Sequence, residues 1–296
     1  MTRMGDVLAG IHSTWEFDTD SVLIRFERGI RTPKLFQVLG ERRIPYEALS
    51  SVELAPGSRK GTVVLHAVPR AGADPLVEAA AGQLRQAADP YRLVLPAERE
   101  ALAAYYAGEL RVALGPEAGR EADHHLVAAP VTPLQFKAYD GKVSFDGKVV
   151  SFRWFWTGAS SAKWKAGDQT FPVSELADVE WRSPEIAGGH LRLLRRGSDG
   201  QPEPDRGPVD QDPAAVVFGP GYGLVHESLP LAAAVLEAIH ASGPEENGRR
   251  DGVSGKRRAA PADIAERIRH LGELHRSGLV TDEEFTAKKR ELLAEL

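Results

Sequence analysis

The sequence contains no cysteine, which excludes disulfide bonds, thiolate nucleophiles, cysteine-ligated zinc and iron–sulfur clusters. It also lacks long apolar runs. Leu231–Leu236 is among the longest, whereas a membrane-spanning helix needs roughly 20 apolar residues. Residues 1–10 hold no apolar stretch of the length found in signal peptides. We therefore expect a soluble protein with a cytoplasmic location.

Motifs of catalysis are missing as well. The sequence holds no Gly-x-Ser-x-Gly, His-Glu-x-x-His or Gly-Lys-Ser/Thr motif. Gly219–Gly223 is rich in glycine, but Leu224 stands where a nucleotide-binding loop needs a third glycine, so we interpret this segment as a turn. His124 and His125 are adjacent in a linker, an arrangement that rarely forms a preorganised metal site. We predict no enzymatic activity, no cofactor and no metal ion.

The charge balance does not favour a nucleic-acid partner. The chain has 37 Lys and Arg against 42 Asp and Glu, a formal net charge of -5. A local basic cluster, residues 256–258, lies in a segment of Gly, Ser, Pro and charged residues, and we interpret it as part of a solvated linker. No nucleic acid is expected among the partners.

An internal repeat is the strongest pattern in the chain. Residues 44–54 and 171–181 share the pattern apolar-Pro-x-x-x-Leu-x-x-Val-Glu-apolar at an offset of 127 residues (171 − 44 = 127). Phe17-Asp18 matches Phe145-Asp146 at nearly the same offset, and Gly40 matches Gly167. Because the matches come in the same order, the sequence predicts two copies of one domain.

Each copy shows short segments of alternating apolar residues followed by one helical segment. Such alternation of β-branched and aromatic residues is typical of half-buried strands. The sequence therefore predicts a mainly β, α+β fold in which a small curved sheet or partial barrel is covered by a helix. The helices are expected from about Pro96 and about Pro230, since proline favours the first helical position. The expected strands include residues 21–26, 61–66 and 91–95 in the first copy, and 148–154, 190–194 and 214–218 in the second.

The segment around Ile44-Pro45 and its copy resemble the strand-turn-strand signature of bacterial pleckstrin-homology-like domains. More closely, the pair resembles a bacterial family of unknown function that occurs as tandem copies before a short C-terminal domain. The resemblance covers about residues 8–114 and 134–242. It implies a seven-stranded sheet capped by a C-terminal helix in each copy, used for binding and not for catalysis.

Composition divides the chain further. Residues 71–88 of the first copy are rich in Ala and predict a short helix, and residues 197–212 of the second predict a mobile loop. The expected order is repeat 1 (8–114), a linker (115–133), repeat 2 (134–242), a flexible tether (243–262) and a helical tail (263–296).

The tail has the local signals of a two-helix hairpin. Thr281 and Glu284 form a capping box, and Val280 can pack on Phe285 as a hydrophobic staple. Residues 271–293 are similar to the short C-terminal domain known as SHOCT, which implies an appendage for oligomerisation or docking. A hairpin this short buries too little apolar surface to be stable alone. We expect it to contact another copy, a partner or the repeats themselves through Ile268, Leu271, Leu274, Leu279, Phe285 and Leu292.

A cluster of basic and aromatic residues in repeat 2 is the candidate ligand edge. Three of the five tryptophans lie within residues 152–165, on either side of a small-residue turn. A hairpin of this composition can bind an anionic lipid headgroup or a peptide. Alternatively, Trp154 and Trp156 share one face and fill the core or the interface between the two copies. The candidate residues are Arg153, Trp154, Trp156, Lys163, Trp164 and Lys165.

The sequence therefore favours a non-enzymatic protein-interaction or scaffold protein whose tail mediates self-association or docking. The alternative is a peripheral membrane adaptor that binds anionic lipid through the basic and aromatic hairpin of repeat 2. The partner itself is not identified by any motif.

Overall fold

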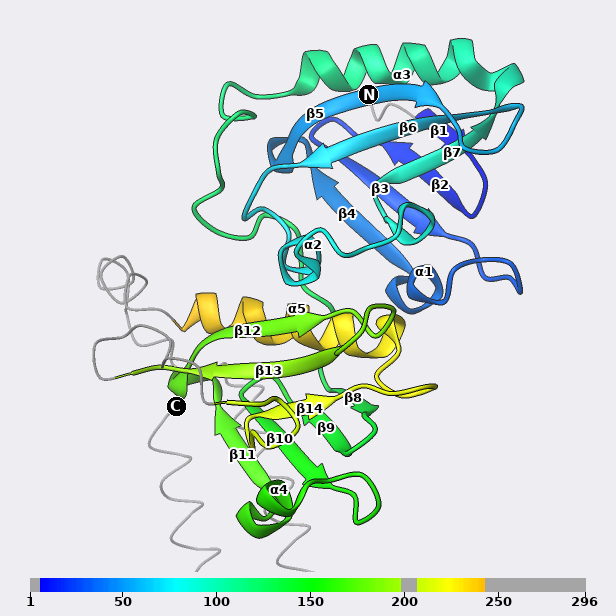
Figure 1. Ribbon diagram of the computed structural model, residues 1–296. Helices are drawn as coiled ribbons and strands as arrows, with labels where there is room; N and C mark the ends of the chain where they lie inside the picture. The colour runs from blue at the N-terminus through cyan, green and yellow to red at the C-terminus, as the bar shows by residue number, and fades with distance from the viewer. Residues whose placement is uncertain (1–5, 198–206, 243–296) are drawn as a thin grey trace, which may run out of the picture. The chain divides into compact units, whose positions relative to one another are not determined.

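The computed structural model describes residues 6–197 and 207–242, so the tether and the tail lie outside the described residues. The fold is mainly β, as predicted, with a helix at the C-terminal end of each repeat (Figure 1). Within the described residues each repeat has seven strands, in an antiparallel sheet of four and an antiparallel sheet of three. The sequence predicted one small curved sheet or a partial barrel, and the structure divides the strands between two sheets.

In repeat 1 the four-stranded sheet has the order β1-β2-β3-β4 and the three-stranded sheet the order β5-β6-β7. A bridge between Ile11 and Val94 links the two sheets. The elements are β1 (Asp6–Ala9), β2 (Ser13–Phe17), β3 (Ser21–Phe26), α1 (Lys34–Leu39), β4 (Glu41–Pro45), β5 (Leu49–Pro56), β6 (Thr62–Pro69), α2 (Pro75–Ala80), β7 (Arg92–Pro96) and α3 (Glu100–Ala113).

Repeat 2 follows the same order, with sheets β11-β10-β9-β8 and β12-β13-β14. The predicted mobile loop, residues 197–212, lies largely outside the described residues. The elements of repeat 2 are β8 (Leu134–Lys137), β9 (Gly141–Phe145), β10 (Val149–Trp154), α4 (Ser161–Ala166), β11 (Gln169–Pro172), β12 (Leu176–Arg182), β13 (His190–Arg195), β14 (Ala215–Val217) and α5 (Val225–Ala241).

The repeated sequence pattern forms the corner where the chain passes from one sheet to the other. Pro45 and Pro172 each end a strand of the four-stranded sheet and precede one turn of 3-10 helix. The shared spacing then places Leu49 and Leu176 at the start of the next strand, where both are buried. The corner explains why each repeat forms two sheets, because the strand direction changes over these three residues.

Two matched glycines end the matched helices. Gly40 follows α1 and Gly167 follows α4, with φ angles of 64° and 72°. Backbone in this region favours glycine, which has no Cβ to clash with the preceding turn. The two glycines therefore match in the sequence because each ends the corresponding helix of its repeat.

The helix α5 is buried more completely than its counterpart α3. It packs on β8 and β12 of its own repeat and also on α1 and α2 of repeat 1. Leu35, Leu76, Ala79 and Ala80 of repeat 1 accordingly belong to the core of repeat 2. The outward side of α3 is exposed instead, at Leu102, Tyr105 and Val112.

The predicted start of α5 was wrong. The helix begins at Val225, five residues before Pro230, which lies inside it. A proline at this position removes one backbone hydrogen bond. Burial of Leu229, Pro230 and Leu231 in the core offsets that loss. In the part of the chain that the structure describes, no helix combines the length and apolar character needed to cross a membrane.

Candidate functional site

The candidate ligand edge of repeat 2 is a strand followed by a helix, not the hairpin that the sequence predicted. Strand β10 ends at Trp154, a loop follows, and α4 begins after Ser160. The Ser160 side chain accepts a hydrogen bond from the backbone N–H of Lys163, which caps the helix. The serine and alanine residues expected to turn a hairpin therefore start a helix instead.

Lys163 was predicted at the ligand edge, but its side chain is fully buried. Its Nζ donates to Oδ2 of Asp140 at 2.6 Å and lies 5.1 Å from the centre of the Trp154 ring. The other oxygen of Asp140 accepts from the backbone N–H of Val217 at 3.0 Å. This buried ion pair joins α4, the β8–β9 turn and β14. Lys163 thus has a positioning role, and the prediction that it faces a ligand was wrong.

Trp154 was also predicted at the ligand edge, and it is buried too, with 7% of its surface exposed. Its indole N–H donates to the Gly167 carbonyl at 2.7 Å. The alternative interpretation, in which Trp154 and Trp156 both fill the core, holds for Trp154 alone, because the two side chains separate at the end of β10. Trp156 is 78% exposed.

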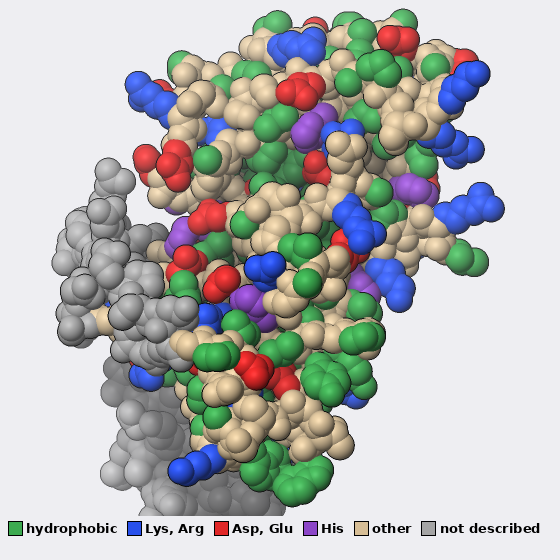
Figure 2. Space-filling model, in the orientation of Figure 1, with side chains coloured by type: hydrophobic (Ala, Val, Ile, Leu, Met, Phe, Trp, Pro, Cys, Tyr) green, Lys and Arg blue, Asp and Glu red, His purple; other side chains and the backbone are tan. Residues whose placement is uncertain are grey.

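Four aromatic side chains form an exposed surface at the α4 end of repeat 2, which we call the aromatic surface. Trp156 and Trp164 (51% exposed) contact each other edge to face, with ring centres 5.1 Å apart. Tyr139 (51%) and Tyr222 (41%) form a second edge-to-face pair at 6.3 Å. Figure 2 shows hydrophobic side chains gathered over α4 and the loops beside it. The sequence did not predict the two tyrosines, because they come from turns distant in the chain.

The loops that carry the aromatic surface are fixed to one another. The backbone N–H of Phe155 donates to the Asp140 carbonyl at 2.9 Å. A Cβ atom at Gly158 would lie 2.3 Å from the Tyr139 carbonyl oxygen, so only glycine allows this approach. The Gly219–Gly223 segment is a turn, as predicted, and Gly219 lies against the Tyr139 ring. The two aromatic pairs are therefore held in place before any ligand arrives.

The basic residues predicted at the ligand edge differ in their surroundings. Arg153 is exposed and lies 3.6 Å from the Asp168 carboxylate. Lys165 is exposed and has no ion pair within the described residues. Of the three predicted cations, therefore, Lys163 is buried in an ion pair, Arg153 is exposed in an ion pair, and Lys165 is exposed without one in the described part of the chain. The predicted tail contacts, from Ile268 to Leu292, lie outside the described residues.

A second group of functional side chains lies where α2, the linker and α5 meet. A buried network fixes α2. Arg42 donates to both carboxylate oxygens of Asp74 at 2.8 and 2.9 Å, and Tyr91 donates to the same carboxylate at 2.6 Å. Asp74 also accepts from the N–H of Leu76 and so caps the helix. The next turn of α2 carries Glu78.

The linker is packed against repeat 1, although the sequence predicted a flexible loop around His124 and His125. The backbone N–H groups of Leu126 and Val127 donate to the Ala73 carbonyl at 2.9 and 3.0 Å. Val127 is buried, and Arg42 donates to the Ala128 carbonyl at 3.4 Å. These contacts hold the His125 side chain, which is 1% exposed, against α2 and α5.

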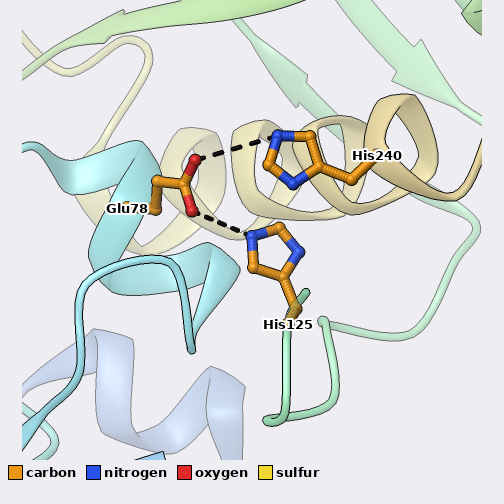
Figure 3. A group of neighbouring side chains, drawn as sticks. All are labelled: Glu78, His125 and His240. Atoms are coloured by element: carbon orange, nitrogen blue, oxygen red, sulfur yellow. Dashed lines mark hydrogen bonds and ion pairs between the residues drawn. The ribbon is translucent and has the colours of Figure 1, made fainter. Parts of the chain in front are cut away.

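His125 lies beside Glu78 and against a second histidine, His240 (Figure 3). A second glutamate, Glu237, contacts the other ring nitrogen of His125. The Nε2 of His125 donates to Glu78 at 3.0 Å and its Nδ1 donates to Glu237 of α5. The His240 ring stacks on the His125 ring with centres 4.6 Å apart, and its Nε2 lies 3.8 Å from the other oxygen of Glu78. We call Glu78, His125, His240 and Glu237 the junction cluster. The sequence placed His125 in a linker beside His124 and did not indicate these partners.

The junction cluster alters the acidity of its members. Burial lowers the pKa of His125, but hydrogen bonds to Glu237 and Glu78 outweigh this effect and raise the pKa to about 9. The hydrogen bond from His125 lowers the pKa of Glu78. Burial, together with the nearby Glu78 charge, raises the pKa of Asp178 on β12.

The available sequence signal for the junction cluster was a Glu-x-x-His spacing at residues 237–240. The other two members of the cluster lie more than a hundred residues away in the chain.

The fold and its two sites define a tandem-repeat, mainly β protein with an exposed aromatic surface and a polar cluster between its repeats. Residues 15–111 and 143–236, more than half of the sequence, match the family described as Domain of unknown function (DUF4429), and the chain belongs to this family. Residues 266–293 match the Short C-terminal domain, SHOCT. These matches confirm the predicted duplication and the predicted C-terminal resemblance. No curated protein matches the chain.

Proposed function

We propose that this protein is a non-enzymatic scaffold that binds a protein partner through the aromatic surface of repeat 2. The observation that carries the proposal is the exposure of four aromatic rings on loops fixed by the Asp140–Lys163 pair. Tryptophan and tyrosine are enriched among the residues that dominate protein interfaces. Because the loops are already ordered, binding costs little further conformational entropy.

The local charges favour a protein partner over an anionic membrane. Lys163 is neutralised by Asp140 inside the fold, and Arg153 lies beside Asp168. Among the described residues, Lys165 is therefore the predicted cation without a carboxylate partner. Attraction to anionic lipid depends on several such charges near the surface. The aromatic pairs, by contrast, offer a rigid apolar contact of the kind that anchors protein interfaces.

The test places a photoreactive amino acid at position 164 of the full chain and irradiates living cells. We expect one adduct of defined mass that contains a protein and disappears when Trp156 is changed to Ser. The same photoreactive residue at the fully exposed Ile30 of repeat 1 is the control, and it should give no such adduct. Identical adducts from both positions, or none from position 164, would argue against the proposal.

The second candidate function is binding to an anionic membrane, which the position of Lys165 next to Trp164 favours. Vesicles of phosphatidylcholine and phosphatidylserine are floated with the full chain, and pure phosphatidylcholine vesicles serve as the control. Flotation with the mixed vesicles alone, lost in Lys165→Glu but kept in Lys148→Glu, would support this second function. Absence of flotation with both kinds of vesicle would exclude it.

We further propose that the tail mediates self-association or docking, as the resemblance to the Short C-terminal domain implies. The test compares the light-scattering mass of the full chain with that of a chain lacking residues 259–296. A lower mass per particle in the shortened chain supports self-association. If the mass is equal, and the adduct at position 164 is also equal in yield, the tail has neither role.

A further inference from the structure

We propose that the junction cluster binds a divalent transition-metal ion, and that Zn²⁺ is the ion its donor set suits best. The ligands would be Glu78 of α2, His125 of the linker and His240 of α5. Two imidazoles and one carboxylate form a set that binds zinc in proteins, with further positions open to water. The ion would join three segments that are distant in the chain.

The geometry is close to what zinc requires. The three ligand atoms all lie within 4.8 Å of one another, so one point exists within about 2.8 Å of each (4.8 divided by √3). A zinc ion binds nitrogen and oxygen ligands at a distance of about 2.0–2.2 Å. Each ligand atom must therefore move by less than about 1 Å. The Glu78 and His240 side chains are 34% and 44% exposed, so neither is fixed by packing on every side and both can rotate.

Glu237 completes the arrangement from the other side of His125. Histidine ligands in metal sites commonly donate their second ring N–H to a carboxylate, which fixes the ring and makes the ligating nitrogen more basic. The Nδ1 of His125 donates to Glu237, and its Nε2 points toward Glu78 and the proposed ion position. The linker contacts to Ala73 hold the backbone, so both the ring and its segment are oriented.

Solvent reaches two of the proposed ligands, because the Glu78 and His240 side chains are 34% and 44% exposed. Glu78 also lines a pocket of about 620 Å³ together with Asp178, Glu180 and Arg182. The three carboxylates outnumber the one arginine, so the charge of this pocket favours a divalent cation. When the ion binds, it takes the place of the proton between Nε2 of His125 and Glu78, and that proton is released to solvent.

A metal-free role for the same residues is a simple ion-paired strut, in which protonated His125 bridges Glu78 and Glu237. In that role His240 contributes only a long ion pair, because its Nε2 is 3.8 Å from Glu78. The stacking of two imidazoles beside one carboxylate is explained better by a shared cation, because both Nε2 atoms face the two oxygens of Glu78. The two roles differ in what they predict for changes at His240.

The test titrates the full chain, freed of metal by a chelator, with Zn²⁺ in a metal buffer. We expect a site that is lost, or weakened at least tenfold, in both His125→Gln and His240→Gln. Glu237→Gln should weaken it by about 10- to 100-fold, the usual effect of removing a carboxylate behind a histidine ligand. Bound Zn²⁺ should also raise the melting temperature of the unaltered chain but not of His240→Gln. Co²⁺ should give the visible absorption of a site with nitrogen ligands.

Two controls keep the test specific. His124→Gln changes the exposed neighbour of His125, and His66→Gln changes a histidine that pairs with Glu53 and Asp89. Both variants should keep the zinc site. The far-ultraviolet circular dichroism of each variant shows whether it folds. If folded His240→Gln binds Zn²⁺ as tightly as the unaltered chain, or if the unaltered chain binds none, the junction cluster is only an ion-paired strut.

Discussion

The ammonium group of Lys163 lies 2.6 Å from the carboxylate of Asp140, and both side chains are buried. The pair holds the turn that carries Tyr139 next to the helix that carries Trp164. The residue that the sequence assigned to ligand contact therefore supports the aromatic surface from beneath.

Changing Lys163 to Met should lower the free energy of unfolding by about 3–5 kcal/mol, because Asp140 is left as a buried charge without its partner. Lys165→Met, two residues further along α4, should leave the unfolding midpoint almost unchanged, since Lys165 is exposed. Urea unfolding, monitored by circular dichroism, measures the stability of both variants. Equal midpoints for the two variants would contradict the buried pair.

The adjacent residues Arg42 and Arg43 should respond differently to the same change. Arg42→Met removes the buried partner of Asp74, and the free energy of unfolding should fall by about 3–5 kcal/mol. Arg43→Met removes an ion pair with Asp18 between two exposed side chains, and such pairs contribute little. A loss of stability in Arg43→Met as large as in Arg42→Met would show that the network around α2 is not the anchor we describe.

The tryptophans of repeat 2 should separate into structural and surface residues. Trp154→Ala should cost about 3–5 kcal/mol, because it opens a cavity in the core. Trp164→Ala should cost only about 1 kcal/mol, the contribution of an aromatic pair. The proposed function requires this difference, since Trp164 must be replaceable without unfolding the protein. Thermal unfolding of both variants, with the unaltered chain alongside, decides the point.

Two glycine-to-alanine changes should have opposite signs. Gly108 lies within α3, and a Cβ atom added there would meet open space, so alanine should stabilise the helix by about 0.5–1 kcal/mol. At Gly158 the Tyr139 carbonyl leaves no room for a Cβ atom, so alanine there should lower the free energy of unfolding by about 1–3 kcal/mol. Denaturant midpoints report both, and a stabilising Gly158→Ala would contradict the loop contact that fixes the aromatic surface.

Local patterns made much of the fold predictable. Alternation identified β3, β6, β10 and β13, and the repeated proline-leucine pattern marked the corner between sheets without revealing its shape. Helix ends were harder, because Pro230 is a typical first-turn residue and only tertiary burial extends α5 back to Val225. The split into two sheets was also hidden, since the corner has no sequence signal of its own beyond the repeat.

The sites depended on contacts between distant residues, which a single sequence does not show. Tyr139 and Tyr222 are more than eighty residues apart, and each is unremarkable in its own turn. Basic residues near tryptophans indicated solvent exposure, yet Lys163 turned inward because Asp140 is available to neutralise it. His125 joins its cluster only because the linker hydrogen-bonds to Ala73.

The shared burial of α5 sets an order for biosynthesis. The core of repeat 1 is complete once the chain has been made as far as Val127. Repeat 2 needs Leu35 and Leu76, which repeat 1 already holds in place, to cover α5. As the chain leaves the ribosome, the residues of the first core emerge before those of the second, so α5 closes on a surface that has already been synthesised. If the order of the two repeats along the chain were reversed, α5 would be synthesised before the residues of the other repeat that cover it.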